Sequence, residues 1–263
     1  MTTVIMKFGG KSVSSPKSFL KAAEIIIKKT EEYKNVVVVV SAMGNATDKL
    51  LKLARQVNNN PSFREQDMLL SVGERMSIAL LAMALAVKGK EAISFTGSQS
   101  GIITTDDHSD AKIVNVKPDR IVVELNKGKI VIVAGFQGVS ISKEITTLGR
   151  GGSDTTAVAL AIALNAEKVE FYKDVNGFYD DDPKTNVEAV FYPNLTYEKA
   201  IEIVSKGCKI LSKRCITLAQ KNNVTLHVRS YKKIREKGSF ITKNGIFEKD
   251  SLKKDGKVVY ENL

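Results

Sequence analysis

Residues 36–40 read VVVVV, and this run of five consecutive valines decides the fold class of the chain. Valine is β-branched and favours extended backbone. A strand that is apolar at every position, and not only at every second one, is typical of a parallel sheet covered on both faces. Further strands are expected where short apolar runs recur, at residues 4–8, 130–134, 169–172 and 226–229.

Helical segments alternate with these strands. Residues 16–29 form one expected helix, with Ser14 or Ser15 as its N-cap. The other expected helices cover residues 66–87, 154–164, 197–205 and 209–222. Such alternation predicts an α/β fold with a mainly parallel sheet. No linker rich in serine, glycine or proline interrupts the chain, so we expect one continuous domain with two lobes.

The composition indicates a basic globular protein. The chain has 263 residues, 43% of them hydrophobic, and a formal net charge of +11. Lysines supply 32 of the 40 basic residues and are spread along the whole chain, which favours a lysine-rich surface with a basic site for anionic ligands. Arginine, the usual reader of bases, is scarce, so we expect no nucleic-acid partner.

The compartment is expected to be the cytoplasm. The two cysteines, Cys208 and Cys215, cannot build a disulfide framework, and their spacing suits small buried core residues better than a zinc site. The chain opens directly on a strand and a glycine turn, so no signal peptide is expected. Its longest apolar run, residues 78–87, is too short to cross a membrane, and we expect no membrane partner.

Three strand ends carry glycine clusters. They are KFGG at residues 7–10, GFQG at 135–138 and LGRGGSD at 148–154. The last cluster opens a helix, where backbone N–H groups and the helix dipole attract an anion. Ligands of open parallel sheets bind at the carboxyl ends of the strands. With Lys7 and Arg150 beside two of these clusters, the sequence predicts a phosphate site.

Two acidic features leave alternatives open. Glu74 stands at the start of the apolar helix, where a charge is costly unless it is paired or exposed. It either forms an internal ion pair or cap, or points into a cleft to hold a cationic group such as a substrate ammonium. Residues 180–182 are three aspartates before Pro183, and they form either a solvated turn or the border of a nucleotide site.

Read together, the motifs resemble those of aspartate kinases in the amino acid kinase family. The resemblance runs in order from about residue 4 to residue 242, and its most specific block is TTLGRGGSD at 146–154. The other blocks are KFGGKSV (7–13), VSAMG (40–44) with Thr47 and Asp48, SVGER (71–75), GIIT (101–104), GFQG (135–138), DVNG (174–177) with Asp182-Pro183, GCK (207–209) and VRS (228–230).

This resemblance implies a three-layer αβα sandwich, the amino-acid-kinase fold. It implies that ATP with Mg²⁺ phosphorylates the side chain of L-aspartate to give 4-phospho-L-aspartate, the first step toward lysine, threonine and methionine. Two alternatives stay open. One is a kinase of the same fold with another acceptor, such as glutamate or a nucleoside monophosphate. The other is a non-catalytic regulatory paralogue that binds ATP.

The resemblance assigns a role to each candidate residue. Lys7 and Gly10 would face the transferring phosphoryl group, and Asp154 would organise the catalytic centre. The residues expected to hold aspartate are Ser41, Thr47, Glu74, Phe136, Arg150, Gly151, Gly152 and Ser153. Those expected around the nucleotide are Lys7, Gly9, Gly10, Lys173, Asp174, Tyr179, Lys184 and Lys209. No residue is expected to be a dedicated metal ligand.

The expected domain organisation follows the same resemblance. Residues 1–243 would form the catalytic domain, with the acceptor half at 1–145 and the nucleotide half at 146–243. Residues 244–263 would be a short polar tail, with a hairpin or a frayed end at 253–260. The paired ACT domains of the family would be absent, so we expect insensitivity to lysine and threonine, and any homodimer would form through the kinase domain.

Three positions depart from the family pattern. Lys11 and Lys173 each stand where threonine is common, and Ser212-Lys213 replaces a common His-Pro pair. All three lie toward the nucleotide half.

Overall fold

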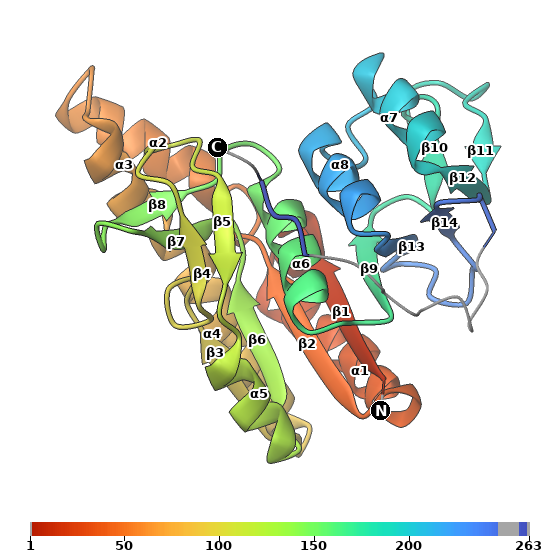
Figure 1. The fold of residues 1–263 in the computed structure, drawn as a ribbon, viewed down its shortest axis with the longest axis horizontal. Coiled ribbons are helices and arrows are strands. Elements are labelled where there is room, and N and C mark those ends of the chain that lie inside the picture. Colours follow the sequence, from red (N-terminus) through yellow and green to blue (C-terminus); the bar gives the residue numbers. More distant parts are fainter. Residues whose placement is uncertain (1, 247–257, 262–263) are drawn as a thin grey trace.

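A computed structural model describes residues 2–246 and 258–261 of the chain. Its centre is an eight-stranded sheet in the order β12-β14-β13-β9-β1-β2-β6-β3 (Figure 1). All neighbouring strands run parallel except β13 and β14, which confirms the predicted mainly parallel sheet. The strands are β1 (Thr3–Phe8), β2 (Asn35–Val40), β3 (Ala92–Phe95), β6 (Ile130–Ala134), β9 (Lys168–Lys173), β12 (Asn194–Thr196), β13 (Thr225–Ser230) and β14 (Ser239–Thr242).

The two faces of this sheet are covered by two separate cores. Along β2, Val36, Val38 and Val40 face one core, while Val37 and Val39 face the other, as the period of two requires. The first core contains residues of α1 (Pro16–Glu32) and α4 (Val72–Val87). The second contains residues of α5 (Asp119–Asn126), α6 (Gly152–Ala163), α7 (Tyr197–Ser205) and α8 (Lys213–Lys221). The expected three-layer αβα sandwich is confirmed.

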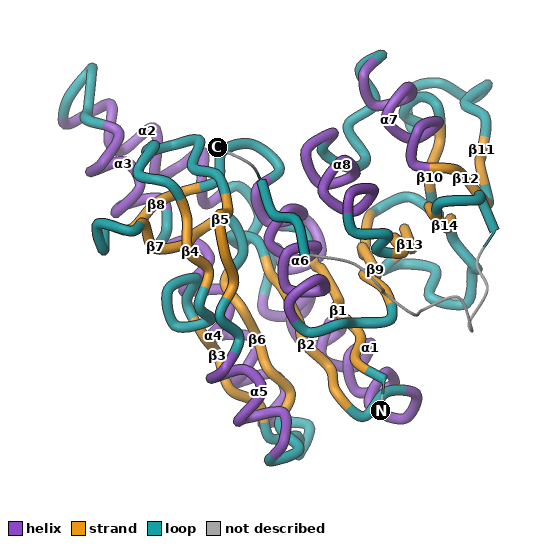
Figure 2. The backbone as a smooth tube through the Cα atoms, in the orientation of Figure 1, coloured by secondary structure: helices purple, strands orange, loops and turns teal. Residues whose placement is uncertain are grey.

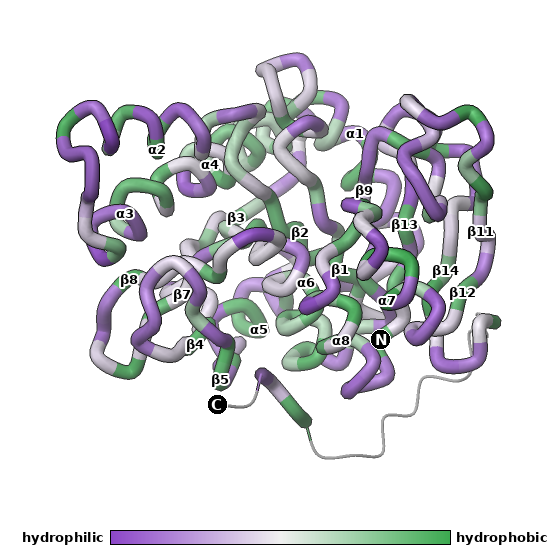
Figure 3. Tube along the Cα trace, turned by 90° about the horizontal axis from the view of Figure 1, so that it is seen from above, coloured by the Kyte–Doolittle hydropathy of each residue, from purple (hydrophilic) through white to green (hydrophobic). Residues whose placement is uncertain are grey.

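Smaller elements lie beyond the carboxyl ends of the central strands. A four-stranded sheet, β5-β4-β7-β8, and a pair, β10-β11, were not anticipated from the sequence (Figure 2). Their bounds are β4 (Ile102–Thr104), β5 (Ile113–Val116), β7 (Gln137–Ser140), β8 (Ile145–Thr147), β10 (Phe178–Tyr179) and β11 (Phe191–Tyr192). The remaining helices are η1 (Gly10–Val13), α2 (Ala46–Val57) and α3 (Phe63–Leu70). Polar residues gather at the periphery and apolar ones in the interior (Figure 3).

The single long helix expected over residues 66–87 is wrong, because the chain breaks it at Ser71 into α3 and α4. The backbone carbonyl of Ser71 accepts a hydrogen bond of 2.8 Å from Nε2 of Gln137. The break also lets Gly73 approach the 42–44 loop, where a Cβ would lie 2.8 Å from Cβ of Ala42. A tertiary contact therefore overrides the helical pattern at this point.

The helix expected over residues 209–222 begins later, at Lys213. Ser212 is extended and is its N-cap, because its side chain accepts from the backbone N–H of Cys215 at 3.2 Å. Lys209 is left in the loop before α8. The N-terminal helix, in contrast, starts where expected, with Ser15 and Ser18 forming a reciprocal capping box.

The stretch from Phe63 to Val87 is long and apolar enough, by length and composition, to cross a membrane. Half of its most apolar window is buried within the protein, where α4 packs against α1, β3 and β6. We therefore interpret α4 as a core helix with one exposed apolar face. Most of the expected hairpin or frayed end at residues 253–260 lies outside the described residues.

Candidate active site

A cavity of about 230 Å³ lies where β1, β2 and β6 end and α6 begins. It contains every residue that the sequence assigned to the acceptor or to catalysis. These residues are Lys7, Gly10, Ser41, Thr47, Glu74, Phe136, Arg150, Gly151, Gly152, Ser153 and Asp154. We call it the acceptor cavity. Ala42, Gly44 and Gly149 also line it and were not singled out from the sequence.

Close backbone packing shapes this cavity. A Cβ on Gly10 would lie 2.7 Å from the carbonyl oxygens of Ala42 and Gly44, so only glycine lets these two loops meet. Gly151 has φ of +78° and is the N-cap of α6. Phe136 also adopts a left-handed conformation, with φ of +69°, which is uncommon for a residue with a side chain. Such strain is often found at functional sites.

Glu74 is the one buried acid of the cavity wall formed by α4. Its side chain is only 3% exposed, and its Oε1 accepts a hydrogen bond of 2.9 Å from the backbone N–H of Ala42. Its Oε2 is buried and has no hydrogen-bond partner among the described residues. Burial raises the pKa of this carboxyl to about 7, although the bond from Ala42 opposes the shift. Of the two readings of Glu74, the ion pair is not seen among the described residues; the bond from the Ala42 N–H is a backbone contact of the kind a cap makes, and Glu74 also lines the cavity.

Asp154 holds two lysines at the edge of the cavity. Its carboxylate lies 2.6 Å from Nζ of Lys7 and 3.2 Å from Nζ of Lys173. Burial opposes ionisation of Asp154, but the two ammonium groups outweigh it and keep the pKa of the acid below its usual value. Burial also lowers the pKa of Lys7, with Asp154 acting against that shift. The three side chains form a buried cluster with two positive charges and one negative charge.

A second cavity, of about 420 Å³, lies beside the end of β9. Four of the residues assigned to the nucleotide line it, namely Asp174, Tyr179, Lys184 and Lys209. We call it the nucleotide cavity. Asp174 accepts from Lys184 and, at 3.2 Å, from Lys11. Partial burial opposes the ionisation of Asp174, yet these two lysines lower its pKa to about 2.

Four residues assigned to the nucleotide do not line the nucleotide cavity, and two of them, Lys7 and Gly10, line the acceptor cavity instead. Lys173 reaches the site through Asp154 and does not line the nucleotide cavity, and Gly9 lines neither cavity. The carbonyl of Gly9 accepts from the backbone N–H and the hydroxyl of Ser12, which closes the first turn of η1.

Sequence reasoning missed three contributors. Lys11, noted only as a departure, lines the nucleotide cavity, as does Cys208, which was expected in the core. Asp67 is fully buried, and its carboxylate accepts from the backbone N–H and hydroxyl of Thr147 at 3.0 and 2.5 Å. It also contacts Nδ1 of His108 at 2.9 Å. Asp67 thereby fixes the strand that leads into Arg150, and no local motif marks it.

The two cavities meet at consecutive residues. Gly10 lines the acceptor cavity and Lys11 the nucleotide cavity. At the end of the neighbouring strand, Lys173 binds Asp154 of the acceptor cavity, and Asp174 lines the nucleotide cavity. Ligands in the two cavities would therefore face each other across Lys7 and Asp154. This arrangement suits transfer of a group between two bound molecules.

Comparisons with known proteins agree with this geometry. Residues 2–230 match the amino acid kinase family. An aspartokinase of Mycolicibacterium smegmatis is 51% identical over 231 residues, which are 88% of this chain and 55% of that protein. The chain thus spans about half the length of the curated relatives it matches.

Solved structures give the same result. Aspartate kinase from Synechocystis superposes with a TM-score of 0.81 at 42% identity, covering 92% of this chain and 40% of that one. E. coli aspartokinase III in complex with aspartate and ADP gives a TM-score of 0.81 at 26% identity, covering 92% of this chain and 64% of that one. By its sequence, its sheet and its paired cavities, the chain belongs to the amino acid kinase family.

Proposed function

We propose that this chain transfers the γ-phosphoryl group of ATP to the side-chain carboxylate of L-aspartate. The observation that carries the proposal is the buried, unpartnered Oε2 of Glu74, which lines the same cavity as the exposed side chain of Arg150. An α-amino acid presents an ammonium and a carboxylate, so a cavity with one anionic and one cationic wall is complementary to it. The similar aspartokinases support aspartate as the acceptor.

The reaction needs no general base. The attacking group is a carboxylate with a reference pKa of about 3.9, so it is ionised at neutral pH. One of its oxygens forms a bond to the γ-phosphorus, and the bond from that phosphorus to the β–γ bridging oxygen breaks. ADP leaves with the electron pair, the product is the acyl phosphate 4-phospho-L-aspartate, and no proton moves. The obstacle is repulsion between two anions, which positioning and positive charge overcome.

The chain supplies that charge from fixed positions. Nζ of Lys7 sits at the end of β1, held by Asp154 at 2.6 Å, where the transferring phosphoryl group would pass. The N-terminus of α6 adds backbone N–H groups from the cavity wall. Asp154 acts in this scheme as an orienter of Lys7 and Lys173, because both of its oxygens already face ammonium groups.

We propose that Mg²⁺ binds together with the nucleotide. The described residues contain no cluster of three or more histidine, cysteine, aspartate or glutamate side chains that could hold a metal. This fits an ion that takes most of its ligands from phosphate oxygens and water, as Mg²⁺ commonly does. Bound in that way, it would neutralise phosphate charge beside Lys11 and Lys184.

A hydroxamate assay tests the proposal. The protein is incubated with ATP, Mg²⁺, L-aspartate and hydroxylamine, and aspartyl hydroxamate formation is followed together with ADP release. We expect product with L-aspartate and none with L-glutamate or UMP. Product only with another acceptor would replace aspartate as the substrate. ATP binding without turnover on any acceptor would favour a non-catalytic paralogue.

Under the same proposal the chain works in the cytoplasm as a homodimer through the kinase domain. The exposed apolar face of α4 offers a surface for a second copy, since two such helix faces can bury each other about a two-fold axis. Its side chains recur at helical spacing and are Val72, Met76, Leu80, Met83 and Val87. Sedimentation should show a dimer that M76K/M83K converts to a monomer, while L53K/V57K on α2 leaves it intact. A monomeric native chain would contradict this arrangement.

A further inference from the structure

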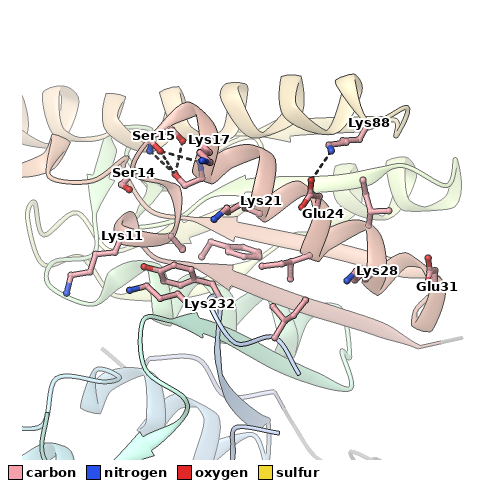
Figure 4. Close-up of a pocket in the computed structure, with 18 residues that line it drawn as sticks. Lys11, Ser14, Ser15, Lys17, Lys21, Glu24, Lys28, Glu31, Lys88 and Lys232 are labelled. Atoms are coloured by element: carbon pink, nitrogen blue, oxygen red, sulfur yellow. Dashed lines mark hydrogen bonds and ion pairs between the residues drawn. The ribbon is translucent and has the colours of Figure 1, made fainter. Parts of the chain in front are cut away.

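A third cavity, of about 960 Å³, lies outside the proposed active site, between α1 and the loop after β13 (Figure 4). Its volume falls within the range of about 300–1,000 Å³ that is usual for small-molecule sites. Part of its lining is apolar and comes from β1, α1 and the loop, namely Phe8, Ala22, Ile25, Ile27, Tyr231 and Ile234. The cavity shares Lys11 with the nucleotide cavity, and the rest of its lining belongs to neither cavity of the proposed active site.

The charged residues of this cavity are mostly of one sign. Six lysines and two glutamates, Glu24 and Glu31, line it, which gives the lining a net charge of +4. The lysines are Lys11, Lys17, Lys21, Lys28, Lys88 and Lys232. Figure 4 shows them spread around the cavity, with Lys21 between Lys11 and Lys232 at one end and Lys28 and Lys88 at the other. A cleft lined by one sign of charge concentrates ions of the opposite sign.

Most of these ammonium groups lack a carboxylate partner. Glu24 binds Lys88 at 2.9 Å, and Lys11 is held by Asp174. Among the described residues, Lys17, Lys21, Lys28 and Lys232 form no ion pair within 4 Å. Lys17 and Lys21 are four residues apart on one helix, a spacing at which like charges repel. The lining keeps a net positive charge, which an anion in the cavity would neutralise.

We propose that this cavity binds a small molecule carrying a chain of two or more phosphate groups. Four unpaired ammonium groups around one cavity match the charge of such a chain, and lysine is a common phosphate ligand. The cavity is open to solvent and has a volume of about 960 Å³ between α1 and residues 231–234, a size that suits a small molecule. Tyr231 also lines the cavity, with Nζ of Lys232 5.9 Å from its ring centroid, and would be the contact for an attached base.

The first test measures binding directly. The protein, saturated with ADP and L-aspartate to fill the other two cavities, is titrated calorimetrically with inorganic tripolyphosphate. We expect one site per chain, and K21E/K28E should weaken it at least tenfold, equivalent to about 1.4 kcal/mol. The matched control K117E/K221E changes the net charge equally at two exposed lysines outside this cavity and should change affinity less than twofold. Equal losses in both variants, or no loss in either, would overturn the proposal.

The second test locates the ligand and does not depend on kinase activity. Lysine acetylation read by mass spectrometry should show tripolyphosphate protecting Lys17, Lys21, Lys28 and Lys232 but not Lys117 or Lys221. Comparing tripolyphosphate with GTP separates an inorganic chain from a nucleotide, because only a nucleotide would lose affinity in Y231A. Protection confined to Lys7 and Lys184 would place the ligand in the active site, and preferential binding of a single-stranded oligonucleotide would indicate a nucleic-acid site. Either result would contradict the proposal.

Discussion

At the scale of single residues, Lys7 stands near the end of a central strand and lines the cavity of the proposed reaction. Its ammonium is almost completely buried and lies 2.6 Å from Asp154, so it is fixed before any substrate arrives. Removing one preorganised charge partner of this kind costs about 3 kcal/mol of transition-state stabilisation. We predict that Lys7→Met lowers kcat at least ~100-fold and leaves the circular dichroism spectrum unchanged. A variant with more than about half of the native kcat would exclude Lys7 from the mechanism.

Glu74 should affect the binding of aspartate but not the binding of ATP. Glu74 lines the acceptor cavity and does not line the nucleotide cavity. We therefore predict that Glu74→Gln raises the KM for aspartate at least ~10-fold, because a charge-assisted hydrogen bond is worth about 1.5–3 kcal/mol. The KM for ATP should change less than about twofold. If both constants rise together in initial-rate measurements, Glu74 has a structural role instead.

The pKa of Glu74 also predicts how the protein responds to pH. With a pKa of about 7 in the ligand-free protein, Glu74 takes up a proton as the pH falls through 7. Only the ionised form holds an ammonium, so the KM for aspartate should rise about fivefold from pH 7 to pH 6 and approach a tenfold rise per unit below that. Since the raised pKa means that the folded state binds this proton more tightly, Glu74 contributes stability that grows from pH 7 toward 4.5, its usual pKa.

The matched variant isolates this effect. In Glu74→Gln the aspartate KM should no longer vary between pH 8 and pH 6, while its value stays high throughout. An unchanged pH profile in the variant would assign the titration to another group.

Most residues of the site could be predicted because the chemistry lies in contiguous motifs at strand ends. Lys7 and Arg150 stand beside glycine clusters at strand ends, whereas Ser41 was assigned from the resemblance to aspartate kinases. Asp67 could not be predicted, because its partners Thr147 and His108 are brought to it by a sheet that the sequence did not reveal. Lys11 was placed toward the nucleotide half, but its contact with Asp174 could not be predicted, since the two residues are 163 positions apart.

At the scale of elements, Glu170 on β9 forms ion pairs with residues of α1 and β13. It is fully buried and lies within 3.2–3.5 Å of the charged atoms of Lys29, Lys168 and Arg229. Burial opposes its ionisation, but His227 and these cations outweigh it and depress its pKa. Its contribution to stability is therefore present above pH 4.5, the usual value, and is lost as the pH falls from there toward the depressed pKa.

We predict that Glu170→Gln lowers the free energy of unfolding by about 3–5 kcal/mol at neutral pH, because buried positive charges lose their counter-charge. Urea denaturation measures this loss. Glu202→Gln is the control, since Glu202 pairs with Lys199 and Lys206 at the surface and should cost at most about 1 kcal/mol. A similar cost for both variants would mean that the buried cluster contributes no more than a surface pair.

Helix boundaries were the least predictable elements. The break at Ser71 depends on a hydrogen bond from Gln137, and the late start of α8 depends on the cap of Ser212. Neither interrupts the apolar periodicity from which the helices were predicted. Ser15, by contrast, was predictable because its capping partner is only three residues away.

At the scale of the whole molecule, the central sheet was predictable and the smaller sheets were not. The strands β2 and β6 are buried on both faces, and this burial gives their sequences uninterrupted apolar runs. Strands such as β4 and β8 have only three residues each. A segment of three residues is too short to show the alternation of apolar and polar residues that distinguishes a strand from a loop.

The meeting of the two cavities at consecutive residues has a consequence for the spacing of the substrates. Neighbouring Cα atoms are about 3.8 Å apart across a trans peptide, a distance that no hinge can alter. Gly10 and Lys11 have this spacing in η1, just after the end of β1, where the two cavities meet. The two cavities are therefore joined by a single peptide link, which keeps their ligands at a short separation. An inhibitor that joins an aspartate mimic to a nucleotide should fit at one linker length only, and lengthening the linker by a single methylene should already weaken it.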